Sequence, residues 1–230
     1  MDWNEWHDEY DRPDSSLARR LVAVQERVRA ALDAAPAGPL RVISMCAGQG
    51  RDLIPVLAEH SRRDDVRARL VELDPANCDL ARSAAAAAGL GRVEVVEADA
   101  SLTDEYADLA PANLVLACGI FGNISDDDVR RTVGFLPQLC AEGGTVVWTR
   151  HREEPDLVPR IRTWFEENGF ALEWVSPPQA GYGVGAHRFT GRPRPLAAGE
   201  SMFRFLGHDE LRRAARASAP TTAEGSREHP

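Results

Sequence analysis

The sequence predicts an α/β fold in which a mostly parallel sheet is covered by helices on both faces. Between residues 40 and 170, short apolar runs alternate five times with segments of helical periodicity. Such alternation is typical of parallel strands joined by helices. Two final apolar runs have no helix between them, which favours an antiparallel end to the sheet. The 230 residues suit one domain with a small appendage.

Seven apolar runs account for the expected strands. They cover residues 41–46, 67–73, 93–98, 112–118, 145–150, 171–176 and 182–191. Helices are expected where apolar residues recur every three or four positions between start and stop signals, such as Pro75 and Gly89. These segments cover residues 17–35, 48–61, 74–90, 101–109, 125–144 and 155–170.

Three regions are expected along the chain. Residues 1–39 would form an N-terminal segment and a helix, and residues 40–206 the α/β domain. Residues 207–230 would form a partly disordered tail, in which residues 208–217 have the pattern of one short helix.

Charge and composition exclude several classes of function. All 27 basic residues are arginines, which excludes chemistry that needs a lysine amine, such as a Schiff base or a Walker-type phosphate loop. The formal net charge of −9 disfavours nucleic acid as a partner. No apolar run approaches the roughly 20 residues that cross a bilayer. The acidic N-terminus is unlike a secretory signal.

Four widely spaced cysteines form neither a metal-binding nor a disulfide pattern. Cys46, Cys78, Cys118 and Cys140 include no CxxC pair and have no histidine cluster beside them. We therefore expect reduced thiols, no metal site and a cytoplasmic location.

Three consecutive strand tips carry groups that suit adenosine. Gly48 and Gly50 lie between the first strand and a helix, where they let the backbone approach a ligand or simply make a tight turn. Glu72 ends the second strand, at the spacing from the turn at which a carboxylate binds a ribose diol. Asp99 ends the third strand, where it would bind an adenine amino group or cap the next helix, a role for which Ser101 competes.

Over residues 40–190 the chain resembles the class I S-adenosylmethionine-dependent methyltransferases. The motifs that carry the resemblance are CAGQG (46–50), VELDP (71–75), VEADAS (96–101) and LACGIFGNIS (116–125). The resemblance implies a Rossmann-like seven-stranded sheet in the order 3-2-1-4-5-7-6, with strand 7 antiparallel.

The same resemblance implies S-adenosylmethionine as the cofactor and S-adenosylhomocysteine as the product. The residues that would bind the cofactor lie at or beside the strand tips. They are Cys46, Ala47, Gly48, Gly50, Glu72, Leu73, Asp99, Ala100, Cys118, Gly119 and Asn123.

The chain also departs from the pattern of this family. Ser44 and Cys46 stand where the family often has an acid and a first glycine. CGIF (118–121) stands where the branch that methylates nucleic-acid amino groups has an NPPY-like motif, so methylation of a base amino group is not expected.

Three histidines are candidates for a catalytic base, although in-line transfer depends mainly on placement. His151 ends the fifth strand and is the first candidate; the alternative is local pairing with Glu153 or Glu154. His187, on the last strand, would either reach the acceptor pocket or only pack within the pleated sheet. His7 lies on the N-terminal segment, which in this family often folds over the cofactor as a lid.

The candidate acceptor contacts are aromatic or cationic, and an acidic, aromatic lid would suit a cationic or aromatic acceptor. They are Trp6, Tyr10, Phe121, Arg150 and Tyr182. We expect a bacterial methyltransferase acting on a small-molecule acceptor, as a monomer or homodimer, with neither nucleic acid nor membrane as partner.

Two alternatives remain open. The first is an NAD-dependent oxidoreductase, although Leu53 stands where the dinucleotide turn has its third glycine. The second is a non-catalytic module that binds adenosine, against which the intact strand-tip acids argue.

Overall fold

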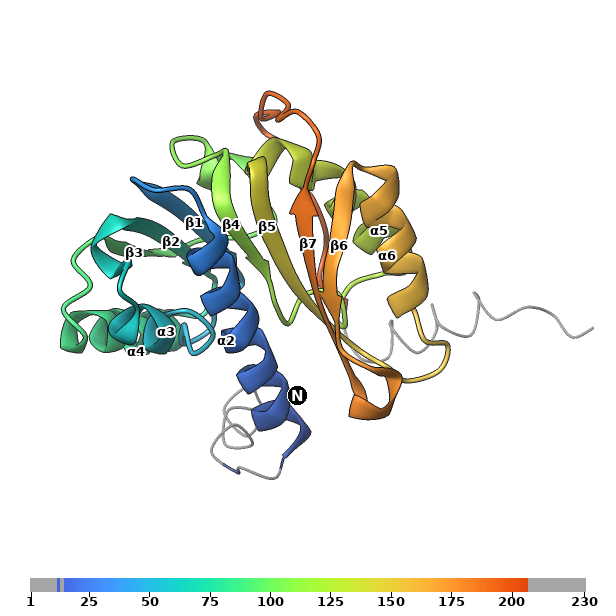
Figure 1. Ribbon diagram of the computed structural model, residues 1–230, viewed down its shortest axis with the longest axis horizontal. Helices are drawn as coiled ribbons and strands as arrows, with labels where there is room; N and C mark the ends of the chain where they lie inside the picture. Colours follow the sequence, from blue (N-terminus) through green and yellow to red (C-terminus); the bar gives the residue numbers. More distant parts are fainter. Residues whose placement is uncertain (1–11, 13–14, 207–230) are drawn as a thin grey trace, which may run out of the picture.

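A seven-stranded sheet forms the centre of the computed structural model, which describes residue 12 and residues 15–206. Its strand order is β3-β2-β1-β4-β5-β7-β6, and the strands can be followed in Figure 1. The strands are β1 (Leu40–Met45), β2 (Val66–Glu72), β3 (Val93–Glu97), β4 (Ala112–Ala117), β5 (Cys140–His151), β6 (Phe170–Val175) and β7 (Tyr182–Phe189).

The first five strands are parallel, and β7 runs antiparallel to both β5 and β6. The predicted order and the antiparallel seventh strand are therefore confirmed. The reason is the connection between β6 and β7, which contains only the short 3₁₀ helix η4 (Pro178–Ala180) and cannot make a parallel crossover.

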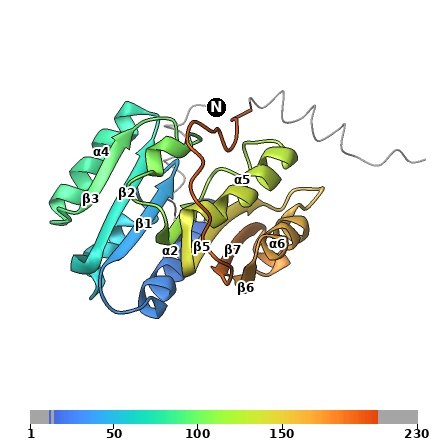
Figure 2. The same ribbon diagram turned by 90° about the horizontal axis from the view of Figure 1, so that it is seen from above.

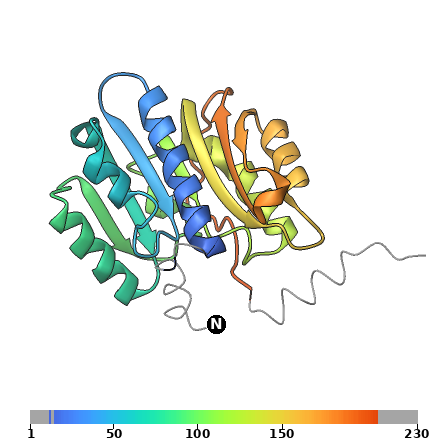
Figure 3. The same ribbon diagram turned by 60° about the horizontal axis from the view of Figure 1, so that its bottom comes forward.

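Helices cover both faces of the sheet, and Figure 3 shows α2 lying along one of them. The α-helices are α2 (Ser16–Ala34), α3 (Ile54–Glu59), α4 (Pro75–Ala87), α5 (Asp126–Leu139) and α6 (Val158–Glu167). Two further 3₁₀ helices are η2 (Arg63–Asp65) and η3 (Thr103–Tyr106). No helix among the described residues is long and apolar enough to cross a membrane.

The alternation of side chains along each strand builds two separate cores. On β1, Val42 packs with buried residues of α2, α3 and α4, whereas Ile43 packs with those of α5 and α6. Successive strand residues point to opposite faces, so a strand covered on both faces must be apolar throughout. This is why the central strands are continuous apolar runs in the sequence.

Three elements differ from the sequence prediction. α3 begins only at Ile54, because the glycine turn occupies the residues before it. Residues 101–109 form the short helix η3 instead of an α-helix. β5 begins at Cys140, directly after α5, and its register against β4 shifts between Ala112 and Leu114. The predicted helix at 208–217 lies outside the described residues.

A segment after β7, which we call the C-terminal strap (residues 192–206), returns along α5 to the carboxyl end of the sheet. Its Arg194 amide donates to the Pro137 carbonyl at 2.9 Å. Near its end, Met202 and Phe203 are buried in the core beneath α5. Figure 2 shows the strap in orange-red between α5 and the half of the molecule that holds β1 and β2.

The packing of β5 on β7 generates a prediction about stability. Gly185 lies opposite Trp148, and a methyl group at Gly185 would overlap the indole ring. We expect Gly185→Ala to lower the free energy of unfolding by about 1–3 kcal/mol, since Trp148 is fully buried and cannot move aside. The measurement is urea unfolding followed by circular dichroism.

Gly134→Ala on α5 is the matched control. No atom lies within 4 Å of the added methyl, so the helix should gain about 0.5–1 kcal/mol. Equal effects of the two substitutions would contradict the packing argument.

Candidate functional site

The candidate site lies at the carboxyl ends of the parallel strands, around the gap between β1 and β4. The chain leaves β1 toward β2 on one side, and β4 lies on the other side. Open α/β sheets bind ligands at such a switch in strand order, because the loops diverge there and leave a crevice. The predicted glycine turn follows β1, Glu72 ends β2 and Asp99 follows β3, all at this same edge of the sheet.

The turn after β1 is built from residues with positive φ. Cys46, Gly48 and Gly50 have φ values of 50°, 54° and 70°. A methyl group on Gly50 would come within 2.9 Å of Leu70, so helix and strand approach too closely for a side chain there. Cys46 adopts the left-handed conformation although it replaces a glycine of the related family, so the local fold does not require glycine at that position.

Glu72, at the end of β2, binds this turn directly. Its Oε2 accepts from the Gly48 amide at 2.7 Å. Its Oε1 accepts from the amides of Leu73 at 3.0 Å and Asp74 at 2.9 Å. Each carboxylate oxygen has about two acceptor positions, so Oε2 can still accept from a ligand hydroxyl. Glu72 therefore holds the turn in place and remains able to bind a ribose diol.

Asp99 and Leu73 are exposed beside Glu72. Asp99 Oδ1 accepts from the Ser101 amide at 2.9 Å, so the carboxylate shapes its own turn, and no described residue binds its second oxygen. Leu73 exposes 67% of its surface at the tip of β2. An apolar side chain suits the face of an adenine ring, and a neighbouring acceptor suits the amino group at its edge, so this composition fits an adenine.

Both acids affect the thiol of Cys46 through their charge. Burial raises the pKa of the Cys46 thiol well above its ordinary value, and the charges of Glu72 and Asp99 raise it further. Burial likewise raises the pKa of Cys118, with a further contribution from Asp52. Both cysteines therefore stay protonated and act as small walls of the site, not as nucleophiles.

The loop between β4 and α5 is closed by its own hydrogen bonds. The Gly119 amide donates to Thr149 Oγ1 at 2.8 Å, and Asn123 Nδ2 donates to the Gly119 carbonyl at 2.7 Å. The Asn123 amide nitrogen is thus used within the loop, which the sequence did not indicate. The Asn123 carbonyl accepts from the Leu206 amide at 2.9 Å, so the strap also holds the loop.

His151 lies next to this loop, at the carboxyl end of β5. A methyl group on Gly122 would come within 3.3 Å of the imidazole ring. His151 pairs across the sheet with Tyr182, whose hydroxyl donates to the Arg19 carbonyl of α2 at 3.4 Å. His151 Nδ1 accepts from the Glu153 amide at 3.3 Å. The local contact with Glu153 that the sequence suggested is therefore present, through the backbone.

The electrostatic surroundings of His151 favour its neutral form. Burial lowers the pKa of His151 below the ordinary 6.5, and the neighbouring Arg150 lowers it further. The carboxylates of Glu153 and Asp126 oppose this change. A half-buried imidazole that is neutral near pH 7 is able to accept a proton.

Three predicted site residues lie in the core instead. His187 is fully buried, and its ring stacks on Phe165 with 4.3 Å between centroids. Its Nδ1 accepts from Trp148 Nε1 at 3.0 Å, and burial lowers its pKa to about 3. Phe121 is also fully buried and packs against Trp148. The predictions that His187 is catalytic and that Phe121 contacts the acceptor are therefore wrong.

Arg150 is the third of these residues. Its side chain is only 10% exposed, it donates to the Phe121 carbonyl, and it lies 3.8 Å from Asp126. It neutralises the start of α5 and is not available to an acceptor carboxylate. His7, Trp6 and Tyr10 lie outside the described residues.

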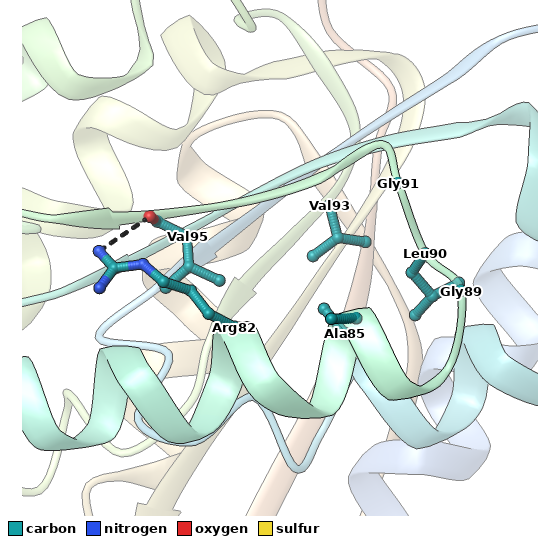
Figure 4. Close-up of a pocket in the computed structure, with 8 residues that line it drawn as sticks. Arg82, Ala85, Gly89, Leu90, Gly91, Val93 and Val95 are labelled. Atoms are coloured by element: carbon teal, nitrogen blue, oxygen red, sulfur yellow. Dashed lines mark hydrogen bonds between the residues drawn. The ribbon is translucent and has the colours of Figure 1, made fainter.

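A separate pocket of about 380 Å³ opens between α4 and the first half of β3. Figure 4 shows Arg82 and Ala85 of α4 on one side, with Val93 and Val95 on the other. It lies on the outer edge of the sheet, toward the amino end of β3, and holds none of the strand-tip groups. We therefore place the candidate site at the strand tips and not in this pocket.

Sequence reasoning missed two contributors to the site. The strap connects the loop after β3 to the loop after β4, through the Met202 and Leu206 amides. The apolar run MFRFL (202–206) was the signal for it. The sequence predicts Asp52, two residues after Gly50, as part of a helix; in the structure its Oδ1 is buried without a partner among the described residues.

Comparisons with known proteins agree with this geometry. Residues 16–175 match the family model Methyltransf_20, described as "Putative methyltransferase". No curated protein sequence matches the chain.

Three solved structures illustrate the shared fold. An O-methyltransferase family protein from Burkholderia thailandensis has a TM-score of 0.57 at 20% identity, over 80% of this chain and 57% of that chain. The 1,6-didemethyltoxoflavin-N1-methyltransferase of the same organism has a TM-score of 0.59 at 18% identity, over 82% of each chain. That structure contains bound 1,6-didemethyltoxoflavin and S-adenosylhomocysteine. An RNA methyltransferase from Salinibacter ruber, in complex with S-adenosylhomocysteine, has a TM-score of 0.50 at 19% identity, over 76% of this chain and 95% of that chain.

Two of these proteins are named for different acceptors, a small molecule and RNA, so the fold alone leaves the acceptor open. This chain also spans only 57% of the length of the first of them. The family match covers well over half of the chain, and the strand order is the one that the class I resemblance implies. The chain therefore belongs to the methyltransferase family that this model describes.

Proposed function

We propose that this protein transfers a methyl group from S-adenosylmethionine to a small-molecule acceptor and releases S-adenosylhomocysteine. The observation that supports this most is the hydrogen bond from the Gly48 amide to Glu72 Oε2, which joins the glycine turn to the tip of β2 in a chain that belongs to a methyltransferase family. Glu72 would bind the ribose diol and Asp99 the adenine amino group. The Cys46–Gly50 turn would let the backbone approach the ligand.

The site residues fit this cofactor in shape and polarity. Gly48 and Gly50 add no side chain to the turn, and the crowding at Gly50 leaves no room for one. Leu73 offers an exposed apolar surface to the adenine face. When bound, the cofactor supplies an electrophilic methyl group.

The protein's contribution would be placement, exclusion of water and removal of a proton from the acceptor. Placement contributes about 7–11 kcal/mol in well-oriented reactions, and a base typically adds about 10²–10⁴-fold. His151 is the base that we favour, because it is half-buried, neutral at pH 7 and beside the β4–α5 loop. Nδ1 of His151 accepts a long hydrogen bond from the Glu153 amide, so the ring proton is on Nε2. To act as a base, His151 must either break this hydrogen bond and accept at Nδ1, or lose the proton from Nε2 and accept there.

The charges around His151 favour a neutral or cationic acceptor. Asp126, Asp127 and Asp128 form the first turn of α5, and Glu153 and Glu154 are exposed after β5. Such an acidic rim repels phosphates and attracts amines. It supports a small molecule over a nucleic acid.

The structure gives no support to the oxidoreductase alternative. Leu53, at the position of the third dinucleotide glycine, is fully buried in the core with α2 and α4. In a dinucleotide-binding turn, a glycine at this position lets the helix pack closely against the strand. Here that space is filled by a leucine side chain.

Glu72→Gln tests the ribose contact. The amide keeps an oxygen that can accept from Gly48 but loses the charge, so we expect affinity for S-adenosylhomocysteine to fall by about 1.5–3 kcal/mol. The measurement is isothermal titration calorimetry. Glu59→Gln, whose side chain is 81% exposed at the end of α3, is the control and should bind as the wild type does. Failure of the wild type to bind at millimolar ligand would overturn the proposed cofactor.

Leu73→Ala tests the adenine contact. It should weaken binding of S-adenosylhomocysteine by about 1 kcal/mol, because apolar area at the strand tip is lost. The unfolding transition should not change, since the side chain is exposed in the free protein. Leu80→Ala on α4, where leucine is 53% exposed, removes the same atoms away from the site. Equal binding by the two variants would contradict the assignment of Leu73.

His151→Asn tests the base, with an acceptor found by transfer of labelled methyl from S-adenosylmethionine into a metabolite extract. We expect kcat to fall by about 10²–10⁴-fold. In the wild type, kcat/KM should fall only as the pH drops below the lowered pKa of His151, where the base becomes protonated. His60→Gln, at the far end of α3, should keep both the rate and this pH profile. A wild-type profile in His151→Asn would remove the base from the mechanism.

A further inference from the structure

The last three residues of β5 extend past the end of β4, and each of them contacts the β4–α5 loop. The ladder between the two strands ends at the pair of Ala117 with Trp148. Thr149, Arg150 and His151 follow and end β5. On this side β5 no longer has a neighbouring strand, so its position relative to β4 depends on the contacts with the loop.

Thr149 and Arg150 hold the loop from opposite faces of the strand. Thr149 Oγ1 accepts from the Gly119 amide at 2.8 Å. The Arg150 guanidinium donates to the Phe121 carbonyl. Successive strand residues point to opposite faces, so the two hydrogen bonds bind the loop on both sides. Thr149 is 2% exposed and the Arg150 side chain 10%, and hydrogen bonds that are shielded from water in this way are strong.

The loop that these residues hold lies against the imidazole of His151. Gly122 directly follows Phe121, and a methyl group on Gly122 would come within 3.3 Å of His151 Cδ2. A shift of the Phe121 carbonyl would therefore carry Gly122 away from the ring or into it. The hydrogen bond from Arg150 thus sets the surface on which the imidazole packs.

Arg150 also places a positive charge beside this imidazole. Burial lowers the pKa of His151, and Arg150 lowers it further. The acids that face His151 come from three elements: Asp126 from α5, Glu153 from the end of β5 and Asp156 from the segment before α6. The same three acids act on Arg150, and Asp126 lies 3.8 Å from its guanidinium. Arg150 is the cation that opposes them.

We propose, on the basis of the proposed function, that Thr149 and Arg150 are positioning residues for the base: they hold the β4–α5 loop against His151, and Arg150 sets the charge next to the ring. Neither residue touches the reacting atoms. The sequence suggested Arg150 as a contact of the acceptor, whereas its buried guanidinium acts on the loop and on the neighbouring imidazole.

The proposal makes the titration of His151 depend on Arg150. A neighbouring cation disfavours the imidazolium, so its removal must raise the pKa of His151. The three acids would then act without an opposing charge. The fall of kcat/KM on acidification should accordingly begin at a higher pH in a variant that lacks the cation.

The first experiment follows the imidazole of His151 by nuclear magnetic resonance during a pH titration, without cofactor or acceptor. The variants are Arg150→Met, which removes the charge and the donor, Arg150→Lys, which keeps both, and Thr149→Val, which changes no charge. His151→Asn identifies the signal. Arg188→Met is the matched control, because Arg188 pairs with Thr145, toward the other end of β5.

We expect Arg150→Met to raise the pKa of His151 and Arg150→Lys to keep the wild-type value. Thr149→Val and Arg188→Met should also keep it. A structural role of Arg150 alone would not produce this pattern, because loosening of the loop exposes the imidazole without separating the lysine from the methionine variant.

The second experiment measures the loop itself by hydrogen exchange. Thr149→Val and Arg150→Met should each speed exchange of the Gly119 amide by about tenfold, the usual loss for one hydrogen bond. With the acceptor found by transfer of labelled methyl, both variants should lower kcat by about tenfold to a hundredfold, because the base is misplaced. The assay is run at a pH where His151 is neutral in every variant, so that only placement differs.

Two results would overturn the inference. The first is an unchanged pKa of His151 in Arg150→Met, or an equal change in Arg150→Lys. The second is wild-type exchange of the Gly119 amide in Thr149→Val, which decides the question if Arg150→Met does not fold. The titration needs no ligand, so it tests Arg150 separately from the proposed function. That function fails on its own if the wild type does not bind S-adenosylhomocysteine, and the base fails if His151→Asn keeps the wild-type rate.

Discussion

The hydrogen bond from the Gly48 amide to Glu72 is the contact on which the site depends. It joins the turn after β1 to the end of β2. The same carboxylate also accepts from the amides of the next two residues, Leu73 and Asp74. A charged acceptor with three amides holds both strand tips in one geometry. The backbone that would face a ligand is thereby set before any ligand arrives. One side chain thus serves the fold and, in the proposed function, the ribose.

A rigid aromatic layer supports the acceptor side of the site from below. Trp148, Phe165 and His187 stack on one another in the core between the sheet and α6. Three residues further along β5, His151 emerges at the strand tip beside the β4–α5 loop. Because the layer beneath is fully buried, the strand end that presents His151 has little freedom to move. The strap adds a second restraint, since it binds the same loop through Asn123.

Charge is distributed unevenly over the site. The nucleoside end has two carboxylates that are partly or fully open to a ligand, and the middle has a buried carboxyl whose own pKa is raised. The acceptor end has an acidic rim with a neutral imidazole inside it. Arg150 is used in holding the start of α5. In the proposed function, such a surface suits a cofactor with positive charge at its centre and an acceptor that is not an anion.

The sequence by itself determined the strands and the strand-tip acids. These follow from local signals, because a doubly covered strand must be a continuous apolar run and a residue after such a run must stand at its carboxyl end. The order of the strands came from the resemblance to the class I methyltransferases, not from a local signal. Only the tertiary structure decided which side chains reach the site. His151 and Arg150 are adjacent in sequence, yet alternation along β5 sends one to the acceptor side and the other beneath α5. His187, on β7, and Phe121, in the loop after β4, are both buried in the core. The role of the strap depends on its hydrogen bonds to the loops after β3 and β4, far from it in the sequence. No local pattern records which distant elements will pack together.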